Sequence, residues 1–231
     1  MQSIVKIILL PFLTVFSTAA PVDDVSRKRA FSAICPSYTI INTRGSEEPQ
    51  GQSTGFLIMN SRITAQLSGG KIYNTVYPAD LLTQDSSGGT RDITDKIAST
   101  LQSSPDECFI LQGYSQGASA TVNALPRITG EAFDAVKGVF LIGDPEHKSG
   151  LACNVDNYGG TTTRDVDGAF LDWSSGIPDN WINKTQDVCI FGDGVCDTAH
   201  GLGITLQHLL YPLDPATQKL GTSFAIKQLG G

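Results

Sequence analysis

The stretch FILQGYSQGASATV, residues 109–122, decides the fold, because it places a serine between two glycines where an apolar run gives way to small residues. The run CFILQG (108–113) has the composition of a buried strand, and SQGASATVNAL after it has the composition of a helix. Ser115 therefore lies at a predicted strand-to-helix turn. The G-x-S-x-G pattern is weak evidence by itself in a chain with 24 glycines, so its surroundings must supply its meaning.

Four other apolar or β-branched runs recur along the chain: YTIINT (38–43), IYNTVY (72–77), GVFLIG (138–143) and VCIFG (188–192). Segments with helical periodicity lie between and after the runs, at 54–67, 90–101, after Ser115, and at 212–229. This alternation predicts an α/β fold with a central five-stranded parallel sheet and helices on both faces. The stretch 150–183 lacks periodicity and is rich in Gly, Asn, Asp and Thr, so we expect an irregular surface excursion there.

Polar, glycine-bearing turns follow four of the five runs directly: RGSEE, GYSQG, GDPEH and GDGVCD. In a parallel sheet the carboxyl ends of the strands meet at one edge, where ligands and substrates bind. The sequence therefore predicts that the chemistry of the protein lies among these four turns.

The N-terminal segment MQSIVKIILLPFLTVFSTAA is typical of a secretory signal peptide, with one lysine, an apolar centre and small residues before the cleavage site. We expect a signal peptide over 1–19 and cleavage after Ala19. A polar pro-segment over 20–29 is predicted to be removed at the dibasic pair Lys28–Arg29, with a tail that stays attached as the alternative. Residues 30–231 then form a single domain.

The chain beyond residue 29 has 12 basic and 21 acidic residues, a net charge near −9. That balance argues against nucleic acid or an anionic membrane as a partner. The five cysteines, at 35, 108, 153, 189 and 196, suggest disulfides in an exported protein, with one thiol left over. No C-x-x-C pair is present, so we expect no metal site and no cofactor. Asn183 begins a sequon for N-glycosylation.

Ser115 can be a nucleophile on a strained turn or an ordinary helix-capping serine, and the strand before it favours the nucleophile. A nucleophilic serine needs a base and an orienting carboxylate, which on this architecture follow it along the chain as acid and then base. His147 lacks a suitable acid before it. The segment CIFGDGVCDTAHGLGITLQHLLYP offers Asp193 and Asp197 as acids, and His200 and His208 as bases.

Four blocks in this order, TRGSEE, GYSQGA, CIFGDGVC and HLLYP, resemble the signature blocks of the cutinase family of secreted serine esterases, which includes acetylxylan esterases. The resemblance runs from Cys35 to the C-terminal helix. It implies a lidless α/β-hydrolase-type fold and a catalytic triad of Ser115, Asp193 and His208.

The resemblance also implies an oxyanion hole formed by the backbone N–H of Gln116 and by the N–H and hydroxyl of Ser46, two donor groups of the kind that acyl transfer requires. It further implies disulfides Cys35–Cys108 and Cys189–Cys196, which leave Cys153 without an evident partner. We expect a monomer that is not inserted in a membrane and acts on a polyester or an acylated plant-surface substrate.

Apolar residues cluster around the predicted base, and Leu81 and Leu82 follow the second predicted strand. The residues near the base are Leu202, Ile204, Leu206, Leu209 and Leu210. They either rim the site and accept short to medium acyl chains or form the core face of a helix, since most follow helical spacing. Two other functions stay open from the sequence: a deacetylase of plant cell-wall polysaccharide, and a secreted binding or signalling protein that keeps the fold without turnover.

Overall fold

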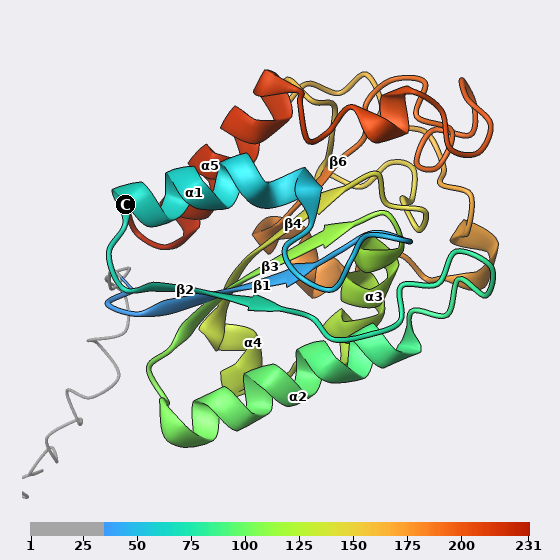
Figure 1. The fold of residues 1–231 in the computed structure, drawn as a ribbon. Helices are drawn as coiled ribbons and strands as arrows, with labels where there is room; N and C mark the ends of the chain where they lie inside the picture. The colour runs from blue at the N-terminus through green and yellow to red at the C-terminus, as the bar shows by residue number, and fades with distance from the viewer. Residues whose placement is uncertain (1–34) are drawn as a thin grey trace, which may run out of the picture. The chain divides into compact units, whose positions relative to one another are not determined.

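The computed structural model describes residues 35–231, which form one open, entirely parallel β-sheet covered by helices on both faces (Figure 1). The predicted signal peptide and pro-segment lie outside the described residues. The strand order across the sheet is β2-β1-β3-β4-β6-β5. The strands are β1 (Tyr38–Thr43), β2 (Gly70–Asn74), β3 (Cys108–Tyr114), β4 (Val136–Ile142), β5 (Asn154–Val155) and β6 (Thr185–Val188).

Helices cover the sheet in two layers, as Figure 1 shows. On one face, α1 (Leu57–Gln66) packs beside α5 (Pro215–Gln228). On the other face lie α2 (Ser87–Ser103), α3 (Gln116–Ala124) and the short α4 (Glu131–Ala135).

Successive residues of a strand point to opposite faces of the sheet, so the central strands supply both cores. Ile41 and Leu111 pack under α2 and α3, whereas their neighbours Ile40 and Ile110 pack under α1 and α5. All of β1 and β3 is buried, which accounts for their nearly continuous apolar sequences.

The predicted fold class is confirmed, but the sheet has six strands and not five. The additional strand is β5, a two-residue edge strand in the stretch that we expected to be irregular. It pairs in parallel with β6. So short a strand leaves no periodic signal in the sequence. The strand expected at 188–192 is also displaced, because β6 runs over Thr185–Val188 and ends where the apolar run begins.

A buried ion pair explains how the polar residues of β6 can form a buried strand. Asp187 in β6 accepts a hydrogen bond at 2.6 Å from Nδ1 of His147, in the turn after β4, and both side chains are fully buried. His147 Nε2 lies 3.0 Å from the carbonyl oxygen of Thr163. Burial by itself would lower the pKa of His147, but the adjacent Asp187 carboxylate outweighs it and raises that pKa. His147 thus joins β4, β6 and the excursion, away from Ser115.

Two disulfides are formed, Cys35–Cys108 and Cys189–Cys196, and Cys153 is a buried free thiol. The first bridge ties the segment before β1 to the start of β3. The second closes an eight-residue loop beyond β6. Together they are the pairings that the family resemblance implies.

The turn between β3 and α3 requires glycine at Gly113 and Gly117 because neighbouring backbone comes too close for a side chain. A Cβ atom at Gly113 would lie 2.6 Å from the carbonyl oxygen of Gly117. A Cβ atom at Gly117 would collide with the carbonyl oxygens of Thr43 and Arg44 at the end of β1. The start of α3 can therefore sit directly against the end of β1.

Gly117→Ala should lower the free energy of unfolding by about 2–3 kcal/mol, because rigid backbone and not a flexible side chain has to move. Urea unfolding followed by circular dichroism measures the change. Gly88→Ala in α2 is the matched control, since its Cβ would meet only ordinary contacts at 3.5 Å from Tyr77 and 3.7 Å from Pro78. Equal effects of the two substitutions would contradict the close approach at Gly117.

Candidate active site

Ser115 lies between β3 and α3 in a backbone conformation that L-residues rarely adopt, with φ 55° and ψ −122°. Its N–H donates to the carbonyl oxygen of Ile142 at 3.0 Å, which anchors the turn to β4. Although Ser115 occupies the position before the first residue of α3, its side chain makes no capping hydrogen bond to the helix. The hydroxyl is therefore directed elsewhere.

The Ser115 hydroxyl meets His208, which in turn meets Asp193. Nε2 of His208 lies 2.9 Å from Oγ of Ser115, and Nδ1 lies 2.9 Å and 3.0 Å from the two carboxylate oxygens of Asp193. His208 and Asp193 are buried. With the imidazole proton on Nδ1 and donated to Asp193, Nε2 is free to accept the Ser115 proton. This arrangement can deprotonate a serine hydroxyl.

Asp193 is held by more than its histidine. Tyr211 donates its hydroxyl proton to one carboxylate oxygen at 2.7 Å, and the N–H of Val195 donates to the other at 3.0 Å. The Cys189–Cys196 disulfide closes the loop around it. Burial, followed by the negative charge of Asp193, raises the pKa of Tyr211 well above its ordinary value, so the phenol stays a donor.

His208 is fixed from the other side through its backbone. Tyr114, the residue before Ser115, donates its hydroxyl proton to the carbonyl oxygen of His208 at 2.6 Å. The Tyr114 and His208 rings pack with centroids 5.4 Å apart. The sequence alone suggests no role for Tyr114 or Tyr211, although they lie within the blocks GYSQG and HLLYP.

The second acid–base pair lies apart from Ser115. Nδ1 of His200 lies 2.9 Å from Oδ1 of Asp197, and the N–H of Gly192 donates to Oδ2 of that carboxylate at 2.9 Å. The His200 ring packs on Phe191 with centroids 4.3 Å apart. Of the three histidines in the chain, the structure brings His208 to the serine, whereas His147 pairs with Asp187 and His200 with Asp197.

Ser46 and Gln116 lie together where β1 and β3 end. The Ser46 hydroxyl donates to Oε1 of Gln116 at 3.0 Å, and Nε2 of Gln116 donates to the carbonyl oxygen of Asp80 at 3.2 Å. Nε2 of Gln84 reaches Ser46 Oγ at 3.3 Å. Within residues 35–231, the backbone N–H groups of Ser46 and Gln116 donate no hydrogen bond. Two N–H donors beside a nucleophilic serine can stabilise an oxyanion.

A buried arginine shapes the loop that carries Ser46. Arg44 donates to the carbonyl oxygens of Glu48 at 2.7 Å and Tyr77 at 2.6 Å, and its guanidinium lies 4.9 Å from the Tyr77 ring centroid. The Glu48 carboxylate accepts the N–H of Gly45 at 2.7 Å. These charge-assisted bonds lock the turns after β1 and β2 together.

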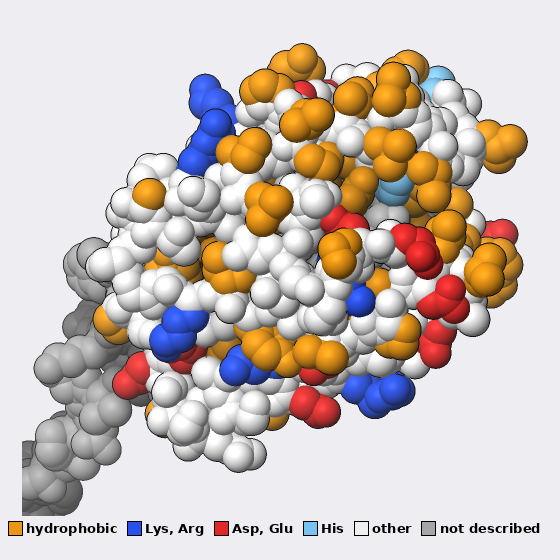
Figure 2. All heavy atoms as spheres, viewed as in Figure 1, with side chains coloured by type: hydrophobic (Ala, Val, Ile, Leu, Met, Phe, Trp, Pro, Cys, Tyr) orange, Lys and Arg blue, Asp and Glu red, His pale blue; other side chains and the backbone are white. Residues whose placement is uncertain are grey.

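The apolar residues near His208 form an exposed rim, which rules out the alternative that they are the core face of a helix. Leu202 is 92% exposed and Leu82 is 94% exposed. Figure 2 shows hydrophobic side chains gathered over the part of the molecule where Figure 1 places the two segments that contain them, around residues 81–82 and 202–213. The rim consists of Leu81, Leu82, Leu202, Ile204, Leu206, Leu209, Leu210 and Leu213.

The described residues contain no group of three or more His, Cys, Asp or Glu side chains placed to hold a metal ion. Among their helices, none combines the length and the apolar character needed to cross a membrane.

Comparison with known proteins identifies the family of the chain. The sequence model of the cutinase family matches residues 34–229. A cutinase-like protein from Cryptococcus sp. has a solved structure with 60% identity and a TM-score of 0.84, covering 87% of this chain and 99% of that one. The catalytic core of acetyl xylan esterase from Trichoderma reesei is 25% identical with a TM-score of 0.67, covering 84% and 99%.

A cutinase from Monilinia fructicola is 24% identical over 238 aligned residues, covering 100% of this chain and 97% of that protein. The family match spans nearly the whole described part of the chain, and the relatives match along most of their own length. The chain therefore belongs to the cutinase family and is a carboxylic ester hydrolase.

Proposed function

We propose that the protein is a secreted serine esterase that hydrolyses esters of short to medium acyl chains through an acyl-enzyme on Ser115. The observation that carries the proposal is the continuous hydrogen-bonded series from Ser115 through His208 to Asp193. Its placement beside two unused backbone N–H donors, at Ser46 and Gln116, supports the same conclusion. Two disulfides suit an oxidising, extracellular compartment.

In the first half of the proposed reaction, Ser115 Oγ attacks the ester carbonyl carbon while His208 Nε2 takes the hydroxyl proton. Asp193 stabilises the imidazolium, and the N–H groups of Ser46 and Gln116 receive the oxyanion. The Ser46 hydroxyl can join them by turning away from Gln116 Oε1, which accepts its proton in the structure. His208 then protonates the leaving alcohol as the C–O bond breaks.

In the second half, a water molecule replaces the alcohol. His208 takes a proton from that water as its oxygen attacks the acyl carbon, and returns the proton to Ser115 Oγ when the acid leaves. The exposed apolar rim lies beside His208 and offers the acyl chain a surface that no other segment of residues 35–231 covers. We infer a polyester or acylated plant-surface substrate from this rim and from the family.

Ser115→Ala should leave the protein folded and lower kcat by about 10³- to 10⁶-fold, as removal of a triad nucleophile does in other serine hydrolases. Hydrolysis of p-nitrophenyl butyrate measures the loss, and a serine-directed phosphonate should label the wild type once and the variant not at all. Ser223→Ala, on the exposed side of α5, is the control and should keep full activity. Labelling of another serine at an equal rate would refute the assignment.

His208→Ala should be nearly as inactive as Ser115→Ala, because it removes the base at 2.9 Å from the serine oxygen. His200→Ala is the matched comparison: it removes the other carboxylate-paired imidazole, which lies outside the proposed site, and should retain activity within about threefold. Steady-state kinetics on the same ester measures both variants. The opposite ranking would transfer the roles of base and acid to His200 and Asp197.

Acyl-chain preference tests the role of the rim. Each methylene placed on apolar surface contributes up to about 0.8 kcal/mol, so kcat/KM should rise from acetate to butyrate by up to about 15-fold and level off when the surface is filled. A series of p-nitrophenyl esters measures it. A strict preference for acetate, together with release of acetic acid from acetylated xylan, would assign the protein to polysaccharide deacetylation. No turnover of any of these esters would contradict the proposed preference for short to medium acyl chains.

A further inference from the structure

The Asp193 carboxylate accepts hydrogen bonds from three donors, and the mechanism above uses one of them. Nδ1 of His208 lies 2.9 Å and 3.0 Å from the two carboxylate oxygens. The N–H of Val195 donates to Oδ1 at 3.0 Å, and the hydroxyl of Tyr211 donates to Oδ2 at 2.7 Å. The bond from Tyr211 is the shortest of these, and a substitution can remove it without changing the triad.

The hydroxyl proton of Tyr211 has one direction. The phenol oxygen accepts the N–H of Ile190 at 3.1 Å, and the Asp193 carboxylate has no proton to donate in return. Gln218 in α5 holds the same residue through its backbone, because Nε2 of Gln218 donates to the carbonyl oxygen of Tyr211 at 2.9 Å. Tyr211 is therefore oriented toward the carboxylate before a substrate binds.

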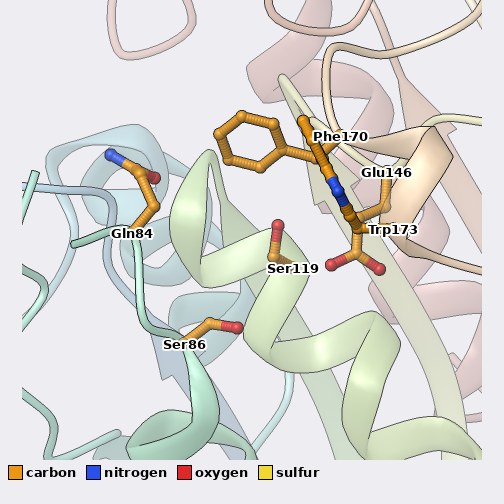
Figure 3. A pocket seen from close by; sticks show the side chains of 6 residues that line it. All are labelled: Gln84, Ser86, Ser119, Glu146, Phe170 and Trp173. Carbon is orange, nitrogen blue, oxygen red and sulfur yellow. The ribbon is translucent and has the colours of Figure 1, made fainter. Parts of the chain in front are cut away.

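The bond between Tyr211 and Asp193 is closed to solvent, since both residues are fully buried among the described residues. A pocket of about 290 Å³ lies beside α3 (Figure 3). Its lining residues are Gln84, Ser86, Ser119, Glu146, Phe170 and Trp173. Neither Tyr211 nor Asp193 is among them, so this pocket brings no water to the bond. Loss of the phenol hydroxyl therefore leaves the carboxylate with one donor fewer.

We propose that Tyr211 is a positioning residue that lets His208 act as a base in mildly acidic solution. The negative charge of Asp193 stabilises the protonated imidazole, and the hydrogen bond from Tyr211 draws part of that charge toward the phenol. The imidazolium is held less strongly as a result. His208 then releases its proton in more acidic solution and is free to accept the proton of Ser115. The inference rests on the proposed function, because it acts through the base of that mechanism.

The other ionisable groups around His208 and Asp193 do not take this part. They are Tyr114 in β3, Ser115 in the turn after it, Glu48 in the loop after β1, which acts on Tyr114, and the Asp197–His200 pair in the loop after β6. Gly143, at the end of β4, approaches the His208 ring without a side chain. Within residues 35–231, the side chains that bond to the Asp193 carboxylate are those of His208 and Tyr211.

The test compares Tyr211→Phe with the wild type between about pH 4.5 and 8.5, with kcat/KM for p-nitrophenyl butyrate as the measurement. Phe keeps the ring and its packing. The variant should be about 3- to 10-fold less active than the wild type at the acidic end and within about twofold of it at the alkaline end. The pH of half-maximal activity should rise by about 0.5 to 1 unit. KM at the alkaline end should stay unchanged, because the buried Tyr211 does not reach the substrate.

Tyr114→Phe is the matched control. It removes the other buried phenol beside His208, which bonds at 2.6 Å to the backbone carbonyl oxygen of His208 and not to Asp193. This variant should lower kcat/KM by the same factor at every pH, without moving the pH of half-maximal activity. A partly unfolded preparation behaves in the same way, and circular dichroism at each pH checks that the folded fraction stays constant.

A constant ratio of the wild-type rate to the Tyr211→Phe rate across the pH range would overturn the proposal and leave Tyr211 a structural role. A fall in the pH of half-maximal activity, or an equal rise in Tyr114→Phe, would also overturn it. Failure of the proposed function is recognised separately, as activity retained in Ser115→Ala or His208→Ala. If both of those variants are inactive and the ratio is constant, only the role of Tyr211 fails.

Discussion

The close approach of α3 to the end of β1 is the constraint on which the site depends. Because Gly117 has no side chain, the carbonyl groups of Thr43 and Arg44 pack directly against the first turn of the helix. Ser115 is thereby brought next to the loop that carries Ser46, and its own backbone is forced to a positive φ. A strained residue persists only where its surroundings determine it, and here two buried strands and a helix do so.

Around this fixed turn, the remaining groups are held by separate devices, each suited to its task. Arg44 locks the turns after β1 and β2 with charge-assisted hydrogen bonds. A disulfide and the Tyr211 hydroxyl hold Asp193, and Tyr114 holds the backbone of His208. Positive φ values at Glu47, Ala79 and Gln84 show that the strained backbone is concentrated in the loops that face Ser115. The apolar cores on the two faces of the sheet support all of these loops.

Prediction from the sequence succeeded where one local pattern determines the structure. The apolar run 38–43 is β1 with the same bounds, and the small residues after Ser115 form α3. It failed at β6, because the polar residues Thr185, Gln186 and Asp187 are not typical of a buried strand. Asp187 can be buried there because it is paired with His147, which comes from a distant turn. The pocket that Ser119 lines could not be predicted from the sequence either, because its lining comes from the turns after β2 and β4, from α3 and from the irregular stretch 150–183. No local pattern reports such a juxtaposition.

Cys153 shows how the folded sheet prevents a free thiol from exchanging with the disulfides. Burial, followed by the charge of Asp187, raises the pKa of this thiol to about 12, so almost none of it is the thiolate that attacks disulfides. It also packs in the core under α2 and α3, whereas Cys35 and Cys108 pack on the opposite face of the sheet. Exchange between them would require the strands to separate. The odd thiol can therefore form wrong bridges only while the chain is still folding, and closure of the sheet is the event that ends this risk.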